Sequence, residues 1–162
     1  SSAFYYCSRL SSINFPNCIS IDASAFCSCY SLSNISFPNC TFIGFEAFYT
    51  CRSLTEVSFP NCTSIREFAF AYCSSLTTIS FPSCATISGG AFRNCYNLLS
   101  VYLLGSSVPI LSSKDAFLST PISTYTTSTG GISGSIYVPA SLYNSYLTAT
   151  NWSIHSARIV SI

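Results

Sequence analysis

Residues 47–68 read AFYTCRSLTEVSFPNCTSIREF, and the neighbouring stretches of the chain repeat most of this pattern. Its opening dipeptide, Ala-Phe, recurs every 22 residues, beginning at Ala3, Ala25, Ala47, Ala69 and Ala91. Leucine, isoleucine or valine, and phenylalanine keep the same period further along each unit, for example at Leu54, Val57 and Phe59. A unit this short cannot bury its own apolar side chains, so copies must stack and share one core. The period therefore predicts a repeat solenoid.

Each unit contains two kinds of local pattern. The Ile-x-Phe segment alternates apolar and polar residues, as a short strand does, and the proline after it ends the strand because proline has no N–H to donate. The Ala-Phe-x-x-Cys-x-x-Leu segment has spacings of three to four residues, which favour a helical or 3₁₀ turn. We therefore expect one short parallel β-sheet on one face of an α/β coil, with tight turns or short helices opposite.

The period divides the chain into two parts. Residues 1–103 carry about five regular repeats, and residues 104–162 are expected to form an irregular last coil and a C-terminal capping segment. A sixth Ala-Phe pair at Ala116, 25 residues after Ala91, suggests a degenerate sixth unit. Residues 119–134 are rich in Ser, Thr and Gly, which predicts a surface loop. Residues 136–138 then read as a strand, and Leu142 and Tyr146 are spaced as on one face of a helix.

The string Leu10-x-x-Ile13-x-Phe15-x-x-Cys18 matches the leucine-rich-repeat strand signature. Together with the Phe-Pro and Ala-Phe-x-x-Cys motifs over residues 3–103, it resembles the BspA-type (Treponema-type) leucine-rich repeats. The resemblance implies a right-handed coil in a bacterial or protist protein that is secreted or on the cell surface. It also implies adhesion to host proteins, cells or matrix. No catalytic residue belongs to the family's motif, so none is carried over.

Two sets of residues are candidates for contact with a partner. One set should line the outer face of the sheet and comprises Asn14, Ser36, Glu56, Ser58, Thr78, Ser80 and Tyr102. The other should lie on the turn side and comprises Tyr30, Tyr49, Arg52, Tyr72, Arg93 and Tyr96. Tyr and Arg are enriched at binding hot spots. The alternatives are that the first set is only a solvated face and that the tyrosines pack over the coil.

Composition argues against several classes of function. The formal net charge is +1 and the cations are scattered, so we expect no nucleic-acid partner. No apolar run approaches the roughly 20 residues of a spanning helix, so we expect no membrane insertion. One histidine, His155, and five acidic residues offer little for catalysis, and we expect neither an enzyme nor a cofactor.

Nine of the ten cysteines recur every 11 residues from Cys7 to Cys95, and Cys27 is the tenth. Because each copies a repeat position and the core is ample, buried free thiols are favoured over disulfides, and zinc binding is disfavoured by the spacing. The resemblance implies that Cys18 and its equivalents point inward and help satisfy backbone groups of the turn.

The expected function is therefore a non-catalytic binding or adhesion module that recognises a protein or glycan. The alternative is a structural subunit that self-assembles through the first coil, because Phe4, Leu10, Ile13 and Phe15 make that coil apolar.

Overall fold

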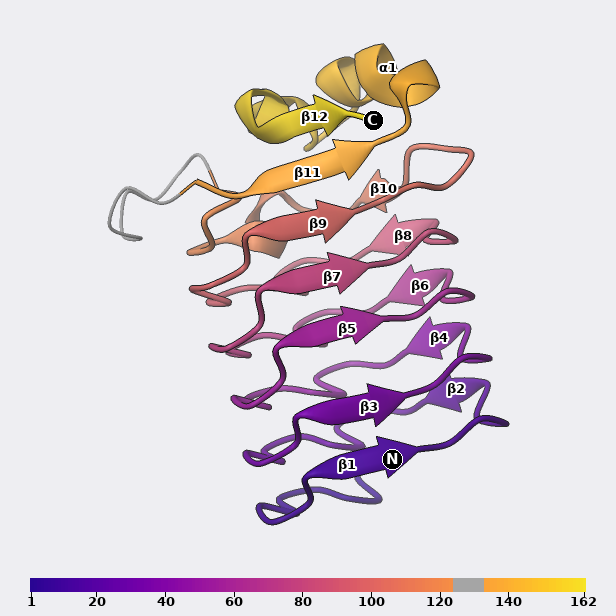
Figure 1. The fold of residues 1–162 in the computed structure, drawn as a ribbon, viewed down its shortest axis with the longest axis vertical. Coiled ribbons are helices and arrows are strands. Elements are labelled where there is room, and N and C mark those ends of the chain that lie inside the picture. The colour runs from indigo at the N-terminus through magenta and orange to yellow at the C-terminus, as the bar shows by residue number, and fades with distance from the viewer. Residues whose placement is uncertain (124–132) are drawn as a thin grey trace.

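The computed structural model describes residues 1–123 and 133–162, which wind into a stack of coils with β1 at one end and the C-terminal segment at the other (Figure 1). Of the loop predicted for residues 119–134, residues 124–132 lie outside the described part. One strand per coil faces the same side, which we call the strand side. Its strands are β1 (Ser12–Asn14), β3 (Asn34–Ser36), β5 (Glu56–Ser58), β7 (Thr78–Ser80), β9 (Ser100–Tyr102), β11 (Ser135–Val138) and β12 (Ile159–Ser161).

Strand-side pairing is parallel and joins equivalent repeat positions, such as Val57 with Ile79 and Ile79 with Val101. β5, β7, β9, β11 and β12 form a five-stranded sheet, whereas β1 pairs with β3 alone. Within the described residues no backbone pairing joins β3 to β5. The predicted parallel sheet and the strand at 136–138 are confirmed, but the sheet is interrupted after its second strand.

A second parallel sheet forms on an adjacent side of the coil and was not predicted. Its strands have two residues each and are β2 (Ser20–Ile21), β4 (Phe42–Ile43), β6 (Ser64–Ile65), β8 (Thr86–Ile87) and β10 (Ile110–Leu111). The isoleucine of each strand from β2 to β8, and Leu111 of β10, is buried. Two residues are too few to show a strand's alternation, so the sequence pattern does not reveal these strands.

The third side, here called the turn side, consists of turns, and the helical alternative predicted for it is wrong within the repeats. Two residues in each of the first five coils have positive φ, one just before the Ala-Phe pair and one just before the cysteine, for example Glu46 (52°) and Thr50 (59°) in the third coil. Backbone N–H groups then donate to the next coil instead of along a helix, as from Phe26 to Ala47 (2.8 Å) and Phe48 to Ala69 (2.7 Å). Each coil is thus tied to its neighbour on the turn side as well.

Phenylalanine rings fill the core in two columns. Phe37, Phe59 and Phe81 are buried and stack in the predicted column, while Phe15 in the first coil is exposed. The Ala-Phe phenylalanines form the second column, with ring centroids 5.0–5.5 Å apart from Phe26 to Phe92. Phe117 continues it 5.5 Å beyond Phe92, which places the predicted sixth Ala-Phe pair in the same stack.

The C-terminal segment covers the last coil. The only α-helix in the described residues, α1 (Tyr143–Thr148), buries Tyr146 as its predicted apolar face requires, and the short 3₁₀ segments are η1 (Lys114–Phe117), η2 (Ala140–Leu142) and η3 (Ser153–Arg158). The carbonyl groups at the outer edge of β10 accept hydrogen bonds from side chains of this segment. Trp152 Nε1 donates to the Pro109 carbonyl and Asn151 Nδ2 to that of Leu111, both at 2.7 Å. These side chains replace the strand of a further coil.

Candidate binding surfaces

The predicted strand-side residues project outward from the sheet, because each strand from β5 to β9 buries its central residue and leaves the flanking ones exposed or half-exposed. Four of them, Glu56, Ser58, Thr78 and Ser80, line one shallow hollow of about 390 Å³. Asn14, Ser36 and Tyr102 are not among its lining residues. Tyr102 instead stacks on Tyr137, with centroids 4.7 Å apart.

This strand-side hollow lies where the sheet is interrupted. Ser33, Asn34 and Ile35 of the second coil line one wall, and Thr55, Glu56 and Val57 of the third coil line another. Ile35 is only half-buried, whereas its equivalents in the neighbouring coils are buried. The lining of the hollow therefore combines short hydroxyl and amide groups and one carboxylate with the apolar side chains of Ile35 and Val57.

On the turn side, large side chains from successive coils touch one another. Tyr6 contacts Tyr30 edge to face at 5.6 Å, and the Arg52 guanidinium lies 5.2 Å from the centre of the Tyr30 ring. A cation over an aromatic face is attracted by the ring quadrupole. Tyr49 and Tyr72 contact each other at 5.3 Å with their planes at 64°. Packing and recognition are thus not exclusive here, because these rings contact each other and remain partly exposed.

A second hollow, of about 240 Å³, lies among these turn-side residues. Its lining brings together three of the predicted residues, Tyr49, Tyr72 and Arg93, and adds Glu46 and Phe68. The other predicted turn-side residues, Tyr30, Arg52 and Tyr96, lie outside it. Burial raises the pKa of Tyr49, with Tyr72 and Glu46 adding to the shift and Arg93 opposing it, so the phenol stays protonated at neutral pH.

Glu46 and Phe68 were not among the residues predicted to contact a partner, although their shared repeat position could have identified them. Both occupy the repeat position just before Ala-Phe, one coil apart, and the amide of Glu46 donates to the carbonyl of Glu67, the residue before Phe68 (3.1 Å). Gly90 holds the same position in the following coil. A Cβ at Gly90 would overlap the Phe68 ring, so the glycine gives Phe68 its place beside the hollow.

The ten cysteines are free, and all but Cys7 and Cys18 are buried. In the first column the thiols of Cys18, Cys40, Cys62 and Cys84 donate to the carbonyl two residues ahead, at 3.2–3.4 Å. In the second, Cys29, Cys51, Cys73 and Cys95 donate to a phenylalanine carbonyl of the preceding coil, at 3.1–3.2 Å. Burial raises the pKa of Cys29 to about 11 and that of Cys95 to about 12. Both columns therefore stabilise the turns as neutral thiols.

Few groups suited to catalysis or metal binding come together. His155 is buried against the edge of Phe117, and burial lowers its pKa to about 4, so it is a neutral core residue at pH 7. Across residues 1–123 and 133–162 there is no group of three or more His, Cys, Asp or Glu side chains placed to hold a metal ion. Nor does any helix in this part of the chain have the length and apolar character to cross a membrane.

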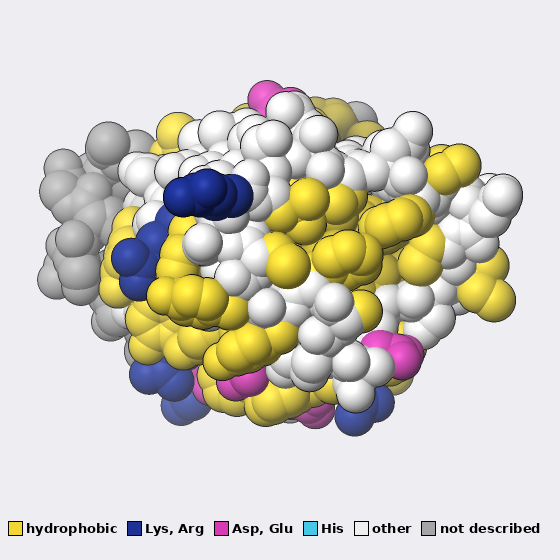
Figure 2. Space-filling view, turned by 90° about the horizontal axis from the view of Figure 1, so that it is seen from below, with side chains coloured by type: hydrophobic (Ala, Val, Ile, Leu, Met, Phe, Trp, Pro, Cys, Tyr) yellow, Lys and Arg dark blue, Asp and Glu magenta, His cyan; other side chains and the backbone are white. Residues whose placement is uncertain are grey.

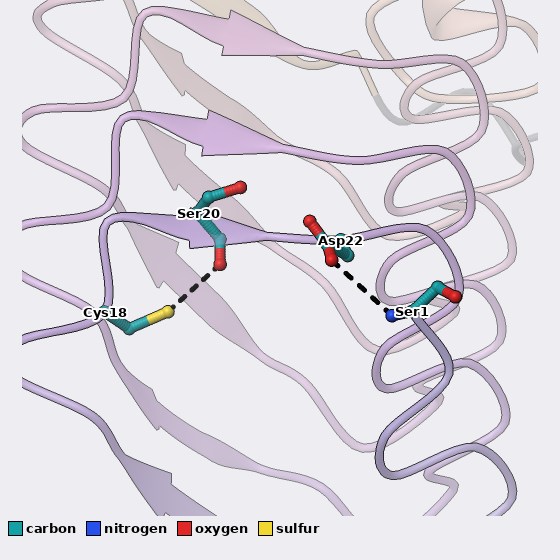
Figure 3. Close-up of polar contacts among 4 residues, drawn as sticks. All are labelled: Ser1, Cys18, Ser20 and Asp22. Carbon is teal, nitrogen blue, oxygen red and sulfur yellow. Dashed lines mark hydrogen bonds and ion pairs between the residues drawn. The ribbon is translucent and has the colours of Figure 1, made fainter.

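The face of the first coil is a third surface. Hydrophobic side chains gather across the middle of this end of the molecule (Figure 2), around a hollow of about 300 Å³ lined by Phe4, Phe15, Phe26 and Phe37 among others. Polar contacts at its margin are few. The amino group of Ser1 pairs with Asp22 at 3.5 Å, and the Cys18 thiol donates to the Ser20 carbonyl at 3.2 Å (Figure 3).

The chain is similar to leucine-rich repeat proteins of known structure. A crystal structure of a leucine-rich repeat protein from Bacteroides ovatus is 30% identical, with a TM-score of 0.61, and the match covers 68% of this chain and 32% of that one. A leucine rich cell surface protein from Faecalibacterium prausnitzii is 29% identical, with a TM-score of 0.68, over 85% of this chain and 35% of that one. The chain therefore spans about a third of the length of these two proteins. No curated protein matches the sequence.

The family model of the BspA-type leucine-rich-repeat region matches residues 1–126 with six copies, slightly more than the five or so regular repeats that the period predicted. The sixth copy agrees with the position of Phe117 in the phenylalanine stack. This chain belongs to the BspA-type leucine-rich-repeat family.

Proposed function

We propose that the chain is a non-catalytic binding module of a cell-surface or secreted protein, and that it recognises a protein or glycan partner on its turn side. The cell-surface part of the proposal draws on the Faecalibacterium relative, which is described as a cell surface protein. Family membership supports a role based on the repeats themselves, because each repeat presents equivalent side chains at a regular interval on one surface.

The observation that carries the proposal is the array of tyrosine and arginine side chains on the turn side. Arg52 over Tyr30, and Tyr49 against Tyr72, are held in fixed positions by their mutual contacts and by the backbone bonds between coils. Rigid aromatic side chains lose little conformational entropy on binding, and Tyr and Arg dominate interface energetics. The strand side offers mainly short hydroxyl groups, so we place the partner on the turn side.

Alanine variants on the two sides test this assignment. Biolayer interferometry with immobilised matrix proteins and glycans would compare Arg52→Ala and Tyr72→Ala with Ser58→Ala and Thr78→Ala. We expect the turn-side changes to weaken binding about tenfold or more, as hot-spot residues do, and the strand-side changes to leave it nearly unaltered. The reverse ranking would move the site to the strand side, and absence of binding to any protein or glycan would refute the proposal for this chain.

A second candidate function is self-assembly through the face of the first coil. It is favoured by the apolar hollow there, in which Phe4 and Phe15 are partly exposed and stand 5.9 Å apart. An apolar coil face favours the stacking of another coil on it. Sedimentation velocity would test it: a concentration-dependent oligomer that Phe15→Asp dissociates supports assembly, and a monomer at all concentrations contradicts it.

A further inference from the structure

We propose that the turn-side hollow formed by Glu46, Tyr49, Phe68, Tyr72 and Arg93 binds one ring of a neutral sugar within a glycan. This inference rests on the proposed binding function and names the class of ligand for part of its surface. Pockets for drug-sized ligands hold roughly 300–1,000 Å³. A hollow of about 240 Å³ therefore has room for one ring and not for several.

The aromatic side chains that line the hollow supply apolar contacts for the sugar ring. Tyr49 and Tyr72 meet at 64°, so their rings line two different sides of the hollow, and Phe68 adds a third aromatic ring. The face of an aromatic ring carries partial negative charge. A sugar ring presents a face of C–H groups, whose hydrogens are weakly positive, and this face can lie on such a ring. Tyr72 remains 37% exposed, which leaves its ring accessible.

The polar contacts would come from two oppositely charged side chains, Glu46 and Arg93, which form no ion pair with each other. Among the described residues the ion pairs join Ser1 to Asp22 and Arg66 to Glu67, so Glu46 and Arg93 stand outside them. Nε of Arg93 is buried and has no hydrogen-bond partner within residues 1–123 and 133–162. A buried donor without a partner calls for an acceptor from a ligand or from water. A hydroxyl group can both accept from Arg93 and donate to Glu46.

The same two charges indicate a neutral ligand. A carboxylated sugar would gain from Arg93 but would be repelled by Glu46, and a basic side chain would meet the reverse situation. Neutral sugars carry several hydroxyl groups around one ring and can satisfy both residues at once.

Local backbone preference gives an independent reason to assign a role to these side chains. Glu46, Phe68 and Tyr72 all have positive φ, at 52°, 56° and 61°. Bulky residues are uncommon in this region, where Gly and Asn are favoured. The next coil places Gly90 and Asn94 at the two equivalent positions. Large side chains at such positions occur at Tyr6 in the first coil, at Glu46 in the third and at Phe68 and Tyr72 in the fourth, and the last three line the hollow.

The experiment uses a panel of immobilised oligosaccharides that end in neutral hexoses, N-acetylhexosamines, sialic acid or uronic acid. We expect binding to the neutral termini and weaker binding to the two acidic ones. Glu46→Gln and Tyr72→Ala should each lower the affinity about tenfold, as loss of a charged hydrogen bond or an aromatic contact does. Glu56→Gln on the strand side and Tyr143→Ala in α1 make the same substitutions away from the turn side and should leave the affinity within about twofold of the parent.

Melting temperatures of all four variants show whether each remains folded, and shifts of the Tyr49 and Tyr72 ring signals in NMR spectra on addition of the bound sugar locate the contact without mutation. Glycan binding that Glu56→Gln lowers and Glu46→Gln does not would overturn the sugar site and leave the binding function intact. Binding to proteins but to no glycan, or a preference for acidic termini, would also overturn the sugar site and leave the binding function intact. Binding to neither class would remove the proposed function as well.

Discussion

The ring of Phe59 lies parallel to that of Phe81 in the next coil, with centroids 5.6 Å apart and planes within 1° of each other. Phe37 stacks on the other side of Phe59 at 5.9 Å. Phe59 also contacts Phe48 and Phe70 of the second phenylalanine column at 6.1 Å. One side chain thus joins three coils and both columns of the core.

Substitution of Phe59→Ala should therefore destabilise the protein by about 3–5 kcal/mol, as loss of a large buried aromatic side chain does. Phe15→Ala is the matched control, because Phe15 occupies the same repeat position but is 39% exposed. Urea denaturation followed by circular dichroism measures both. Equal losses of stability for the two variants would mean that the column is not the core of the solenoid.

Thiol chemistry tests the cysteine columns. Cys7 and Cys18 are half-buried and should react with a thiol reagent in the native protein, whereas the other eight should react slowly because they are buried. Raised pKa values, about 12 for Cys62 and Cys84, also keep those thiols in the unreactive protonated form.

Mass spectrometry after a short alkylation would identify the modified residues. After denaturation without reductant, all ten should react. If few reacted even then, the cysteines would be disulfide-bonded, and the protein would belong in an oxidising compartment.

Features whose pattern extends over several residues of each repeat were predicted correctly, whereas features of one or two residues were missed. The Ile-x-Phe strands and the inward columns recur in every unit, so their period identified them. The strands of the second sheet have two residues each, and a pattern as short as Ser64-Ile65 is indistinguishable from an isolated core position. The turn side was assigned a helical spacing because the sequence does not show that Ser24 or Glu46 has positive φ.

The candidate site was predictable only in part, for a related reason. Tyr49, Tyr72 and Arg93 were recognised by residue type, but they come from three successive coils: Tyr49 and Arg93 share one repeat position, and Tyr72 holds the following position in the coil between them. Their convergence with Glu46 and Phe68 depends on turn geometry and on the missing Cβ of Gly90. The interruption between β3 and β5 is likewise absent from the repeat pattern, which is regular there.

Stability should fall in mildly acidic solution because of His155. Burial lowers its pKa from 6.5 to about 4 in the folded protein, so the unfolded chain binds a proton between these values while the folded chain does not. The free energy of unfolding should therefore decrease as the pH falls from 6.5 to 4, by up to about 3 kcal/mol from this residue, and the effect should level off below that range.

Denaturation at several pH values, compared with His155→Leu, isolates this contribution from that of the carboxylates. The variant should lose less stability between pH 6.5 and pH 4 than the parent. Identical pH profiles would show that the histidine is solvated or paired, and that it does not occupy the buried position beside Phe117.

Two buried hydroxyl groups near the C-terminal end allow a matched comparison. Thr120 Oγ1 donates to the Phe117 carbonyl at 2.7 Å and accepts from the amide of Ile122 at 3.2 Å. The hydroxyl of Tyr146 is also buried, but it has no hydrogen-bond partner within the described residues.

Thr120→Val and Tyr146→Phe each remove one hydroxyl with little change in shape. Thr120→Val should cost about 1–3 kcal/mol, because it leaves the buried amide of Ile122 without its acceptor, whereas Tyr146→Phe should be neutral or slightly stabilising. Thermal denaturation of the two variants decides the matter, and a loss of stability in Tyr146→Phe as large as that in Thr120→Val would mean that the tyrosine hydroxyl is hydrogen-bonded after all.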